Sequence, residues 1–142
     1  MDNRYLYFAF GSNLNTARME SRCPDCRLVG PATLPGWRIV ERLYADIEAG
    51  RGAVRGVLYG VSGYDLARLD AYEGAPHVYA RRVVMVWHGG RQYRAFTYIM
   101  TPGIARLRAG VSFPEDYRAI CAAGAEEHNL SIPLFTKLED FR

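Results

Sequence analysis

The sequence contains few cysteines, a single lysine and no long apolar segment. Lys137 is the only lysine among 18 basic residues, and the formal net charge is only +3. Nucleic-acid-binding domains usually carry a stronger positive charge clustered on one face. The apolar runs at residues 5–10 and 83–87 are far shorter than the ~20 residues of a membrane-spanning helix. We therefore expect neither a nucleic acid nor a membrane as a partner.

The three cysteines match no common metal or redox pattern. Cys23 and Cys26 form one CxxC pair, but a structural zinc site needs four ligands, and neither Cys121 nor the histidines have the usual spacing. We predict two free thiols and no metal. An odd number of cysteines is typical of a reducing compartment, and the first residues lack the apolar core of a secretion signal. We expect a cytoplasmic protein.

Several well-known catalytic motifs are also absent. The chain has no glycine-rich phosphate loop, no G-x-S-x-G elbow and no HExxH, so we expect no cofactor. Its 142 residues, 49% hydrophobic and 23% charged, have the length and composition of one ordinary folded domain. We predict a single domain over residues 1–142, present as a monomer or homodimer.

Glycine and proline divide the chain into short strand-like segments. Residues 5–10 are aromatic-rich and uncharged, which predicts a strand buried on both faces and ended by Gly11. Residues 79–87 and 92–100 flank a Gly-Gly turn and predict a hairpin. The other β-like stretches are residues 27–44, punctuated at Gly30-Pro31 and Pro35-Gly36, and residues 53–61, introduced by Gly50-Arg51-Gly52. We expect about six or seven strands.

Capping patterns predict the helices. Ser62 and Asp65 form a capping box that opens a helix ending at Gly74. Ser112 and Glu115 repeat this pattern for a helix that ends near Asn129. Further expectations are a short helix over residues 15–21, a loop over residues 101–110 and a helical tail within residues 131–142. The fold class is therefore α+β, a small, mostly antiparallel β-barrel or sheet flanked by a few helices.

The turn after the first strand is one candidate site. Successive backbone N–H groups in a glycine-containing turn can converge on a carboxylate or an oxyanion, and Gly11, Ser12 and Asn13 stand at such a turn. The same tripeptide is also common in plain turns, here with Asn15 as helix cap. The residues alone leave both interpretations open.

Glu73 is the second candidate. It follows Leu66 and Leu69 at helical spacing, so its carboxylate shares their inward face. Apolar surroundings and the negative end of a helix both raise a carboxyl pKa, which suits a general base. A glutamate that reaches water at the frayed helix end fits the spacing equally well. Among the ten tyrosines, Tyr79, Tyr98 and Tyr117 are the other candidates, although most tyrosines serve packing.

In their order along the chain, these segments resemble the γ-glutamylcyclotransferase family. The resemblance covers nearly the full chain, and it rests on residues 7–14 (YFAFGSNL), 52–59 (GAVRGVLY), 69–74 (LDAYEG), Tyr79, residues 98–100 (YIM), 114–117 and 124–126. It implies a small β-barrel with flanking helices and a pocket where the loop after the first strand meets the LDxxEG acid.

The resemblance also implies a reaction. In that family the α-amine of a γ-glutamyl group attacks its own γ-amide carbonyl, which yields 5-oxoproline and releases an amine or amino acid, without a cofactor. Glu73 would be the general acid/base of such a lyase. The substrate would be held by Tyr7, Phe8, Ala9, Phe10, Gly11, Ser12, Asn13 and Leu14, through backbone N–H groups, and by Tyr79, Tyr98 and Tyr117 lining the pocket. Phe10 departs from the tyrosine that many members have there.

The sequence leaves the substrate open. A γ-glutamyl amino acid, glutathione, a γ-glutamyl amine and a γ-glutamyl-protected biosynthetic intermediate all fit, although Arg106 and Arg108 would favour an anionic leaving group. A non-catalytic γ-glutamyl-binding module of the same fold is the alternative outside enzymes.

Overall fold

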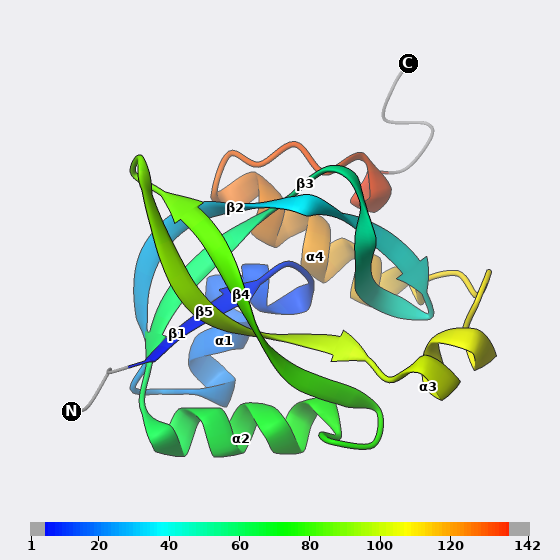
Figure 1. Ribbon diagram of the computed structural model, residues 1–142, viewed down its shortest axis with the longest axis horizontal. Helices are drawn as coiled ribbons and strands as arrows, with labels where there is room; N and C mark the ends of the chain where they lie inside the picture. The colour runs from blue at the N-terminus through cyan, green and yellow to red at the C-terminus, as the bar shows by residue number, and fades with distance from the viewer. Residues whose placement is uncertain (1–4, 137–142) are drawn as a thin grey trace.

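A computed structural model describes residues 5–136, which form a closed, five-stranded mixed β-barrel flanked by helices (Figure 1). The barrel order is β1-β3-β2-β4-β5, with antiparallel neighbours except for the parallel closure of β1 on β5 at Tyr7 and Phe96. The strands are β1 (Tyr5–Ala9), β2 (Arg27–Arg42), β3 (Tyr44–Val61), β4 (Tyr79–His88) and β5 (Arg91–Met100). The helical segments are η1 (Ser12–Leu14), α1 (Thr16–Arg22), α2 (Gly63–Glu73), α3 (Pro102–Leu107), α4 (Glu115–Glu127) and η2 (Pro133–Phe135). The predicted α+β barrel is confirmed.

The strand count of six or seven is wrong, because β2 and β3 run without interruption through the predicted breaks. Pro35 pairs with Ala53, whereas Trp37 pairs with Ala49, so residues 50–52 of β3 lie opposite one residue of β2. Extra residues on one strand of an antiparallel pair form a bulge, and Gly52 takes the positive φ of 99° that a glycine tolerates. The glycines therefore bend the strand and do not end it.

Two predictions about helices are also wrong. Residues 101–110 contain the short helix α3, whose Pro102 sits at the start where proline is favoured. No residue of α3 is fully buried, and only Ile104 and Ala105 of this helix pack against the core, so its apolar face is too short to predict a helix. Ser112 does not cap α4, because the helix begins after Pro114 without a side-chain cap. The predicted tail is the 3₁₀ turn η2, and residues 137–142 lie outside the described residues.

The α2 prediction is confirmed in detail. The Ser62 hydroxyl accepts from the Asp65 N–H, the Asp65 carboxylate accepts from the Ser62 N–H, and Gly74 closes the helix at a left-handed φ of 64°. In Figure 1, α2 runs along the lower edge of the barrel and connects β3 to β4. Leu66 and Leu69 are buried toward the barrel. This packing places the last residue, Glu73, beside the barrel opening.

Helix α4 positions the turn after β1. It packs on η1 at Gly124, where a Cβ atom would collide with the backbone of Leu14 and Asn15. Phe8 and Leu14 are fully buried below this contact, so the turn lies between two packed layers. None of the helices within residues 5–136 is both long and apolar enough to cross a membrane.

Candidate active site

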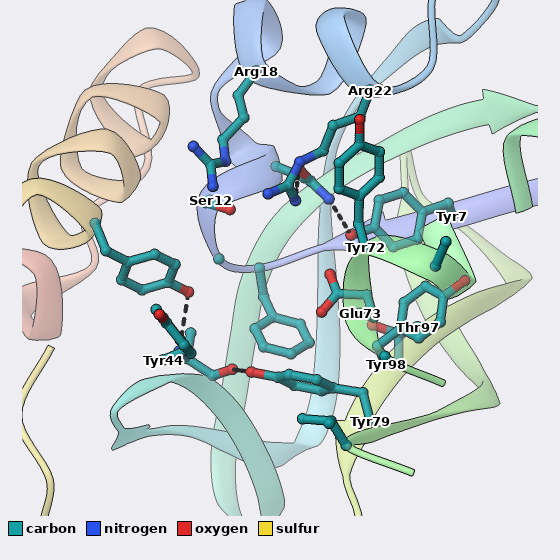
Figure 2. A pocket seen from close by; sticks show the side chains of 18 of the residues that line it. Tyr7, Ser12, Arg18, Arg22, Tyr44, Tyr72, Glu73, Tyr79, Thr97 and Tyr98 are labelled. Carbon is teal, nitrogen blue, oxygen red and sulfur yellow. Dashed lines mark hydrogen bonds between the residues drawn. The ribbon is translucent and has the colours of Figure 1, made fainter. Parts of the chain in front are cut away.

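One pocket of about 380 Å³ opens where η1, α1, the end of α2 and the first residues of β3 meet. Its volume lies in the range of small-molecule sites. Figure 2 shows Glu73 facing the cavity, with Arg18 and Arg22 of α1 on one side and Tyr44 and Tyr79 on the other. The lining residues are Tyr7, Phe10, Gly11, Ser12, Asn13, Arg18, Arg22, Tyr44, Ala45, Ala71, Tyr72, Glu73, Gly74, Val78, Tyr79, Thr97, Tyr98, Arg108 and Tyr117.

Glu73 carries a carboxylate without a bonded partner. Its side chain is half-buried, and no hydrogen bond or ion pair joins it to another of residues 5–136 (Figure 2). Loss of water around the carboxylate raises its pKa to about 7, although the charges of Arg22 and Arg18 act in the opposite direction. The predicted upward shift is present, and it leaves Glu73 able to take up and release a proton near neutral pH.

The turn after β1 is rigidly held. The Asn13 amide donates to the Tyr7 hydroxyl (3.0 Å), and Arg22 donates to the Asn13 side-chain oxygen (3.1 Å). The Tyr59 hydroxyl donates to the Asn13 carbonyl at 2.8 Å. The turn's own backbone hydrogen bonds begin with the N–H groups of residues 14 and 15, so those of Ser12 and Asn13 are not used within it. The first N–H groups of a helical turn are suited to bind an anion.

Three tyrosines form much of the remaining wall. The Tyr79 hydroxyl donates to the Ala45 carbonyl (2.9 Å), and the Tyr117 hydroxyl accepts from the Ala45 N–H (3.0 Å). The Tyr98 hydroxyl donates to the Asp70 carboxylate at 2.6 Å. Burial raises the pKa of all three phenols well above the ordinary value, so each keeps its proton at neutral pH. The wall therefore presents neutral, oriented hydroxyl groups.

The structure brings nine of the twelve sequence-predicted site residues to this pocket. Those nine are Tyr7, Phe10, Gly11, Ser12, Asn13, Glu73, Tyr79, Tyr98 and Tyr117. Phe8, Ala9 and Leu14 do not line it, because their side chains are fully buried in the core. The whole 7–14 segment matches the family pattern, but part of it serves packing.

Sequence reasoning linked Arg108 to an anionic leaving group but missed the other two cations of the pocket, Arg18 and Arg22. Arg18 and Arg22 are four residues apart on α1, so they share one face of the helix and both line the cavity. That spacing, directly after a candidate anion-binding turn, was a usable signal. Arg108 lies about 90 residues after Arg18, in the segment expected to be a loop. No sequence spacing connects it to the other pocket residues, and the fold brings it to the pocket.

None of the three cysteines lines the pocket. Cys23, Cys26 and Cys121 are free thiols, as predicted for the CxxC pair. Burial raises the pKa of Cys23 and Cys121 to about 12 and that of Cys26 to about 11, so none forms a thiolate near neutral pH. Within residues 5–136 there is no cluster of three or more His, Cys, Asp or Glu side chains that could hold a metal ion.

Comparison with known proteins identifies the family. The protein is a small α+β barrel, and its pocket has the size of a small-molecule site and is lined by the carboxylate of Glu73. A family model described as "Gamma-glutamyl cyclotransferase, AIG2-like" matches residues 7–119. The chain belongs to this family.

Solved structures share the fold. One named "Gamma-glutamyl cyclotransferase" is 26% identical, with a TM-score of 0.72 and coverage of 92% of this chain and 82% of that one. The Homo sapiens protein loc79017 is 26% identical, with a TM-score of 0.76 and coverage of 95% and 86%. YkqA from Bacillus subtilis is 27% identical, with a TM-score of 0.76, and the match covers 96% of this chain but 53% of YkqA. No curated protein matches this chain.

Proposed function

We propose that this protein is a γ-glutamyl cyclotransferase that releases 5-oxoproline from a γ-glutamyl amide, with Glu73 as its general acid/base. The observation that carries the proposal is the Glu73 carboxylate, which lies without a bonded partner in the pocket and has a pKa of about 7. Membership of the γ-glutamyl cyclotransferase family supports the same reaction. A cyclising substrate brings its own nucleophile, so the protein has to supply position and proton transfer.

One carboxyl group can perform all the proton transfers of this reaction. Glu73 takes a proton from the substrate α-ammonium group, and the resulting amine attacks the γ-carbonyl carbon to form a five-membered ring. Glu73 then gives the proton to the amide nitrogen as the C–N bond breaks, takes the second proton from the ring nitrogen, and passes it to the released amine, so that the ring keeps one N–H and the carboxylate is restored. A pKa of about 7 suits these transfers, because a group that titrates near the working pH is both a usable base and a usable acid.

The negative charges of the substrate and of the tetrahedral intermediate meet donors on the η1 side of the pocket. In the proposed pose, the α-carboxylate or the carbonyl oxygen lies at the N–H groups of Ser12 and Asn13, close to the positive charge of Arg18 and Arg22. Oriented donors of this kind stabilise an oxyanion because they need no rearrangement during reaction. The hydrogen bonds from Arg22 to Asn13 and from Asn13 to Tyr7 support this role, because they fix the turn.

The test is direct assay of the purified protein without added metal. It is incubated with γ-glutamyl amino acids, γ-glutamyl amines and glutathione, and 5-oxoproline is measured by mass spectrometry. We expect product from at least one class, and a loss of roughly 10²- to 10⁴-fold in kcat for Glu73→Gln. Glu20→Gln, at an exposed position on α1, is the matched control and should retain wild-type turnover.

Two results would oppose the proposal. Equal turnover by wild type and Glu73→Gln would remove the proposed role of this carboxylate. Absence of product from folded wild-type protein, combined with Glu73-independent binding of γ-glutamyl compounds in a calorimetric titration, would instead identify the non-catalytic binding module.

A further inference from the structure

Two arginines that line the pocket each have a buried side-chain nitrogen without a partner in residues 5–136. Within the described residues, Arg18 Nε and Arg108 Nη1 are the buried side-chain nitrogen or oxygen atoms that have no hydrogen-bond partner, and both arginines line the cavity. A buried donor that is left unpaired destabilises the fold by about as much as its lost hydration, and more when it is charged. Such an atom in a native structure calls for a missing partner.

The two arginines lie at different ends of the cavity. Arg18 lies in the first turn of α1, directly after η1, and its charge acts on Glu73 together with that of Arg22. Arg108 stacks over the Tyr44 ring at 5.6 Å from its centroid, and its charge acts on Tyr79. In Figure 2, Arg18 lies at the top of the view, whereas Tyr44 and Tyr79 lie at the bottom. A ligand that pairs both arginines therefore carries two separated negative groups.

The backbone holds Arg108 in this position. Its N–H donates to the Ile104 carbonyl at 2.9 Å, which ends α3, and its carbonyl accepts from the Val111 N–H at 3.1 Å. The Val111 carbonyl then accepts from the N–H of Leu43 at 2.7 Å, at the turn between β2 and β3 and next to Tyr44. The backbone that carries the guanidinium is thus bonded to the turn between β2 and β3.

We infer that Arg108 determines specificity by binding a carboxylate of the leaving group, so that the preferred substrates are γ-glutamyl amino acids or peptides and not γ-glutamyl amines. The inference rests on the proposed function, since it assigns the end of the pocket that the γ-glutamyl group does not fill. The γ-glutamyl carboxylate takes the η1 side with Arg18. The scissile amide then lies at Glu73, and the released part extends toward Tyr44, Tyr79 and Arg108.

Chemistry favours a carboxylate at this place over a neutral or cationic group. Arginine presents several N–H donors in a plane and binds a carboxylate through paired hydrogen bonds. A leaving group that ends in an alkyl chain or an ammonium group would leave Arg108 Nη1 unpaired or would repel it. The Tyr44 ring below the guanidinium restricts its motion and shields it from water on one face, which strengthens the ionic hydrogen bond.

The experiment compares substrates that differ only in the leaving group. γ-Glutamyl-alanine, γ-glutamyl-alaninamide, γ-glutamyl-ethylamine and the tripeptide γ-glutamyl-alanyl-glycine are assayed for 5-oxoproline with wild type, Arg108→Gln and Arg106→Gln. We expect wild type to favour γ-glutamyl-alanine over its amide by roughly 10- to 100-fold in kcat/KM, the range of one charge-assisted hydrogen bond. Arg108→Gln should lose that preference, because its kcat/KM should fall far more for γ-glutamyl-alanine than for the two neutral substrates. Arg106→Gln, exposed on the same helix, should keep it.

The outcomes separate the inference from the proposed function. No 5-oxoproline from any substrate with wild type refutes the proposed function itself. Turnover of all substrates without a carboxylate preference, or a preference that survives in Arg108→Gln, overturns only the inference. An equal loss on every substrate in Arg108→Gln would mean that Arg108 binds the γ-glutamyl carboxylate, and would also overturn the inference.

The tripeptide shows whether Arg108 binds a carboxylate next to the scissile amide or one residue further away. Thermal unfolding of each variant verifies folding, and Arg108→Lys should recover part of the preference.

Discussion

Helix α2 carries an acid near each end, and the two carboxylates differ in their hydrogen-bond partners. In the first turn, Asp65 is completely buried, yet its carboxylate accepts from the Ser62 N–H at 3.0 Å and from Arg68 at 3.1 Å. In the last turn, Glu73 is half-buried and has no hydrogen bond to another described residue, and burial raises its pKa to about 7. The fully buried acid therefore has two bonded partners, whereas the less buried acid has none among the described residues.

The difference shows that partners, and not burial alone, distinguish a structural acid from a candidate catalytic acid. Asp65 also lies at the positive end of the helix dipole, whereas Glu73 lies at the negative end, where a carboxylate is disfavoured. Asp65 therefore stabilises the helix as an anion. The buried Leu66 and Leu69 fix α2 against the barrel and so hold Glu73 at this unfavourable position. Perturbed carboxyl groups of this kind are common among groups that perform proton transfer.

The largest effect expected at either end is the loss of catalysis in Glu73→Gln. Amide for carboxylate keeps the shape but removes proton transfer, so kcat for 5-oxoproline formation should fall by roughly 10²- to 10⁴-fold, or about 3–5 kcal/mol in the activation barrier. The free energy of unfolding at pH 8 should be unchanged or higher, because an unpaired anion is removed. Parallel turnover assays and urea titrations measure both. A variant that lost stability along with activity would show that Glu73 is a structural acid like Asp65.

For Asp65→Ala we expect the opposite result, a loss of stability with unchanged activity. The change removes the acceptor of the Ser62 N–H and of Arg68, and leaves that backbone donor buried, so unfolding should become easier by about 2–3 kcal/mol. Ser62→Ala, which removes the other half of the capping box, should lose about 1 kcal/mol. Urea midpoints determine both values. The folded fraction of each variant should keep wild-type kcat, and a large loss of kcat at full folding would contradict the division between the two ends.

The pH dependence of stability provides a further contrast. The pKa of Glu73 is raised from 4.5 to about 7 on folding, so the folded protein binds this proton more tightly than the unfolded chain. Stability from this group is complete below about pH 4.5 and is lost as the pH rises through 7. Allowing for solvent at a half-buried carboxyl, wild type should lose about 2 kcal/mol relative to Glu73→Gln between pH 4.5 and 8. A constant difference between the two proteins over this range would disprove the raised pKa.

Both ends of α2 were predictable because their signals are local. A capping box, two leucines at helical spacing and a closing glycine lie within thirteen consecutive residues, and the face that carries Glu73 follows from the same spacing. The hairpin of β4 and β5 was predictable for the same reason. The bulge at residues 50–52 was not, because Gly-Arg-Gly fits a turn and a bulge equally well until the partner strand is known.

The rest of the site depends on contacts that sequence spacing does not reveal. Arg108 joins the pocket because residues 101–111 are bonded to the turn between β2 and β3. Phe8 and Leu14 belong to the matching family segment, but they face the core, and no local pattern separates them from Tyr7 or Ser12. Resemblance identified the region of the site, whereas the fold determined which side chains face it.

The smallest expected effect concerns the arginines of α1, whose positive charges lower the pKa of Glu73. Arg22 is the strongest influence that lowers the pKa of Glu73, so Arg22→Gln should raise that pKa and move the ascending limb of the kcat/KM profile upward by roughly one pH unit. Arg27→Gln, an exposed position at the start of β2, should leave the limb in place. Arg22 also holds Asn13 at 3.1 Å, so the variant should in addition have a lower plateau. A lower plateau with an unmoved limb would mean that Arg22 acts on the turn alone, and that the proton affinity of Glu73 is set by its burial without help from α1.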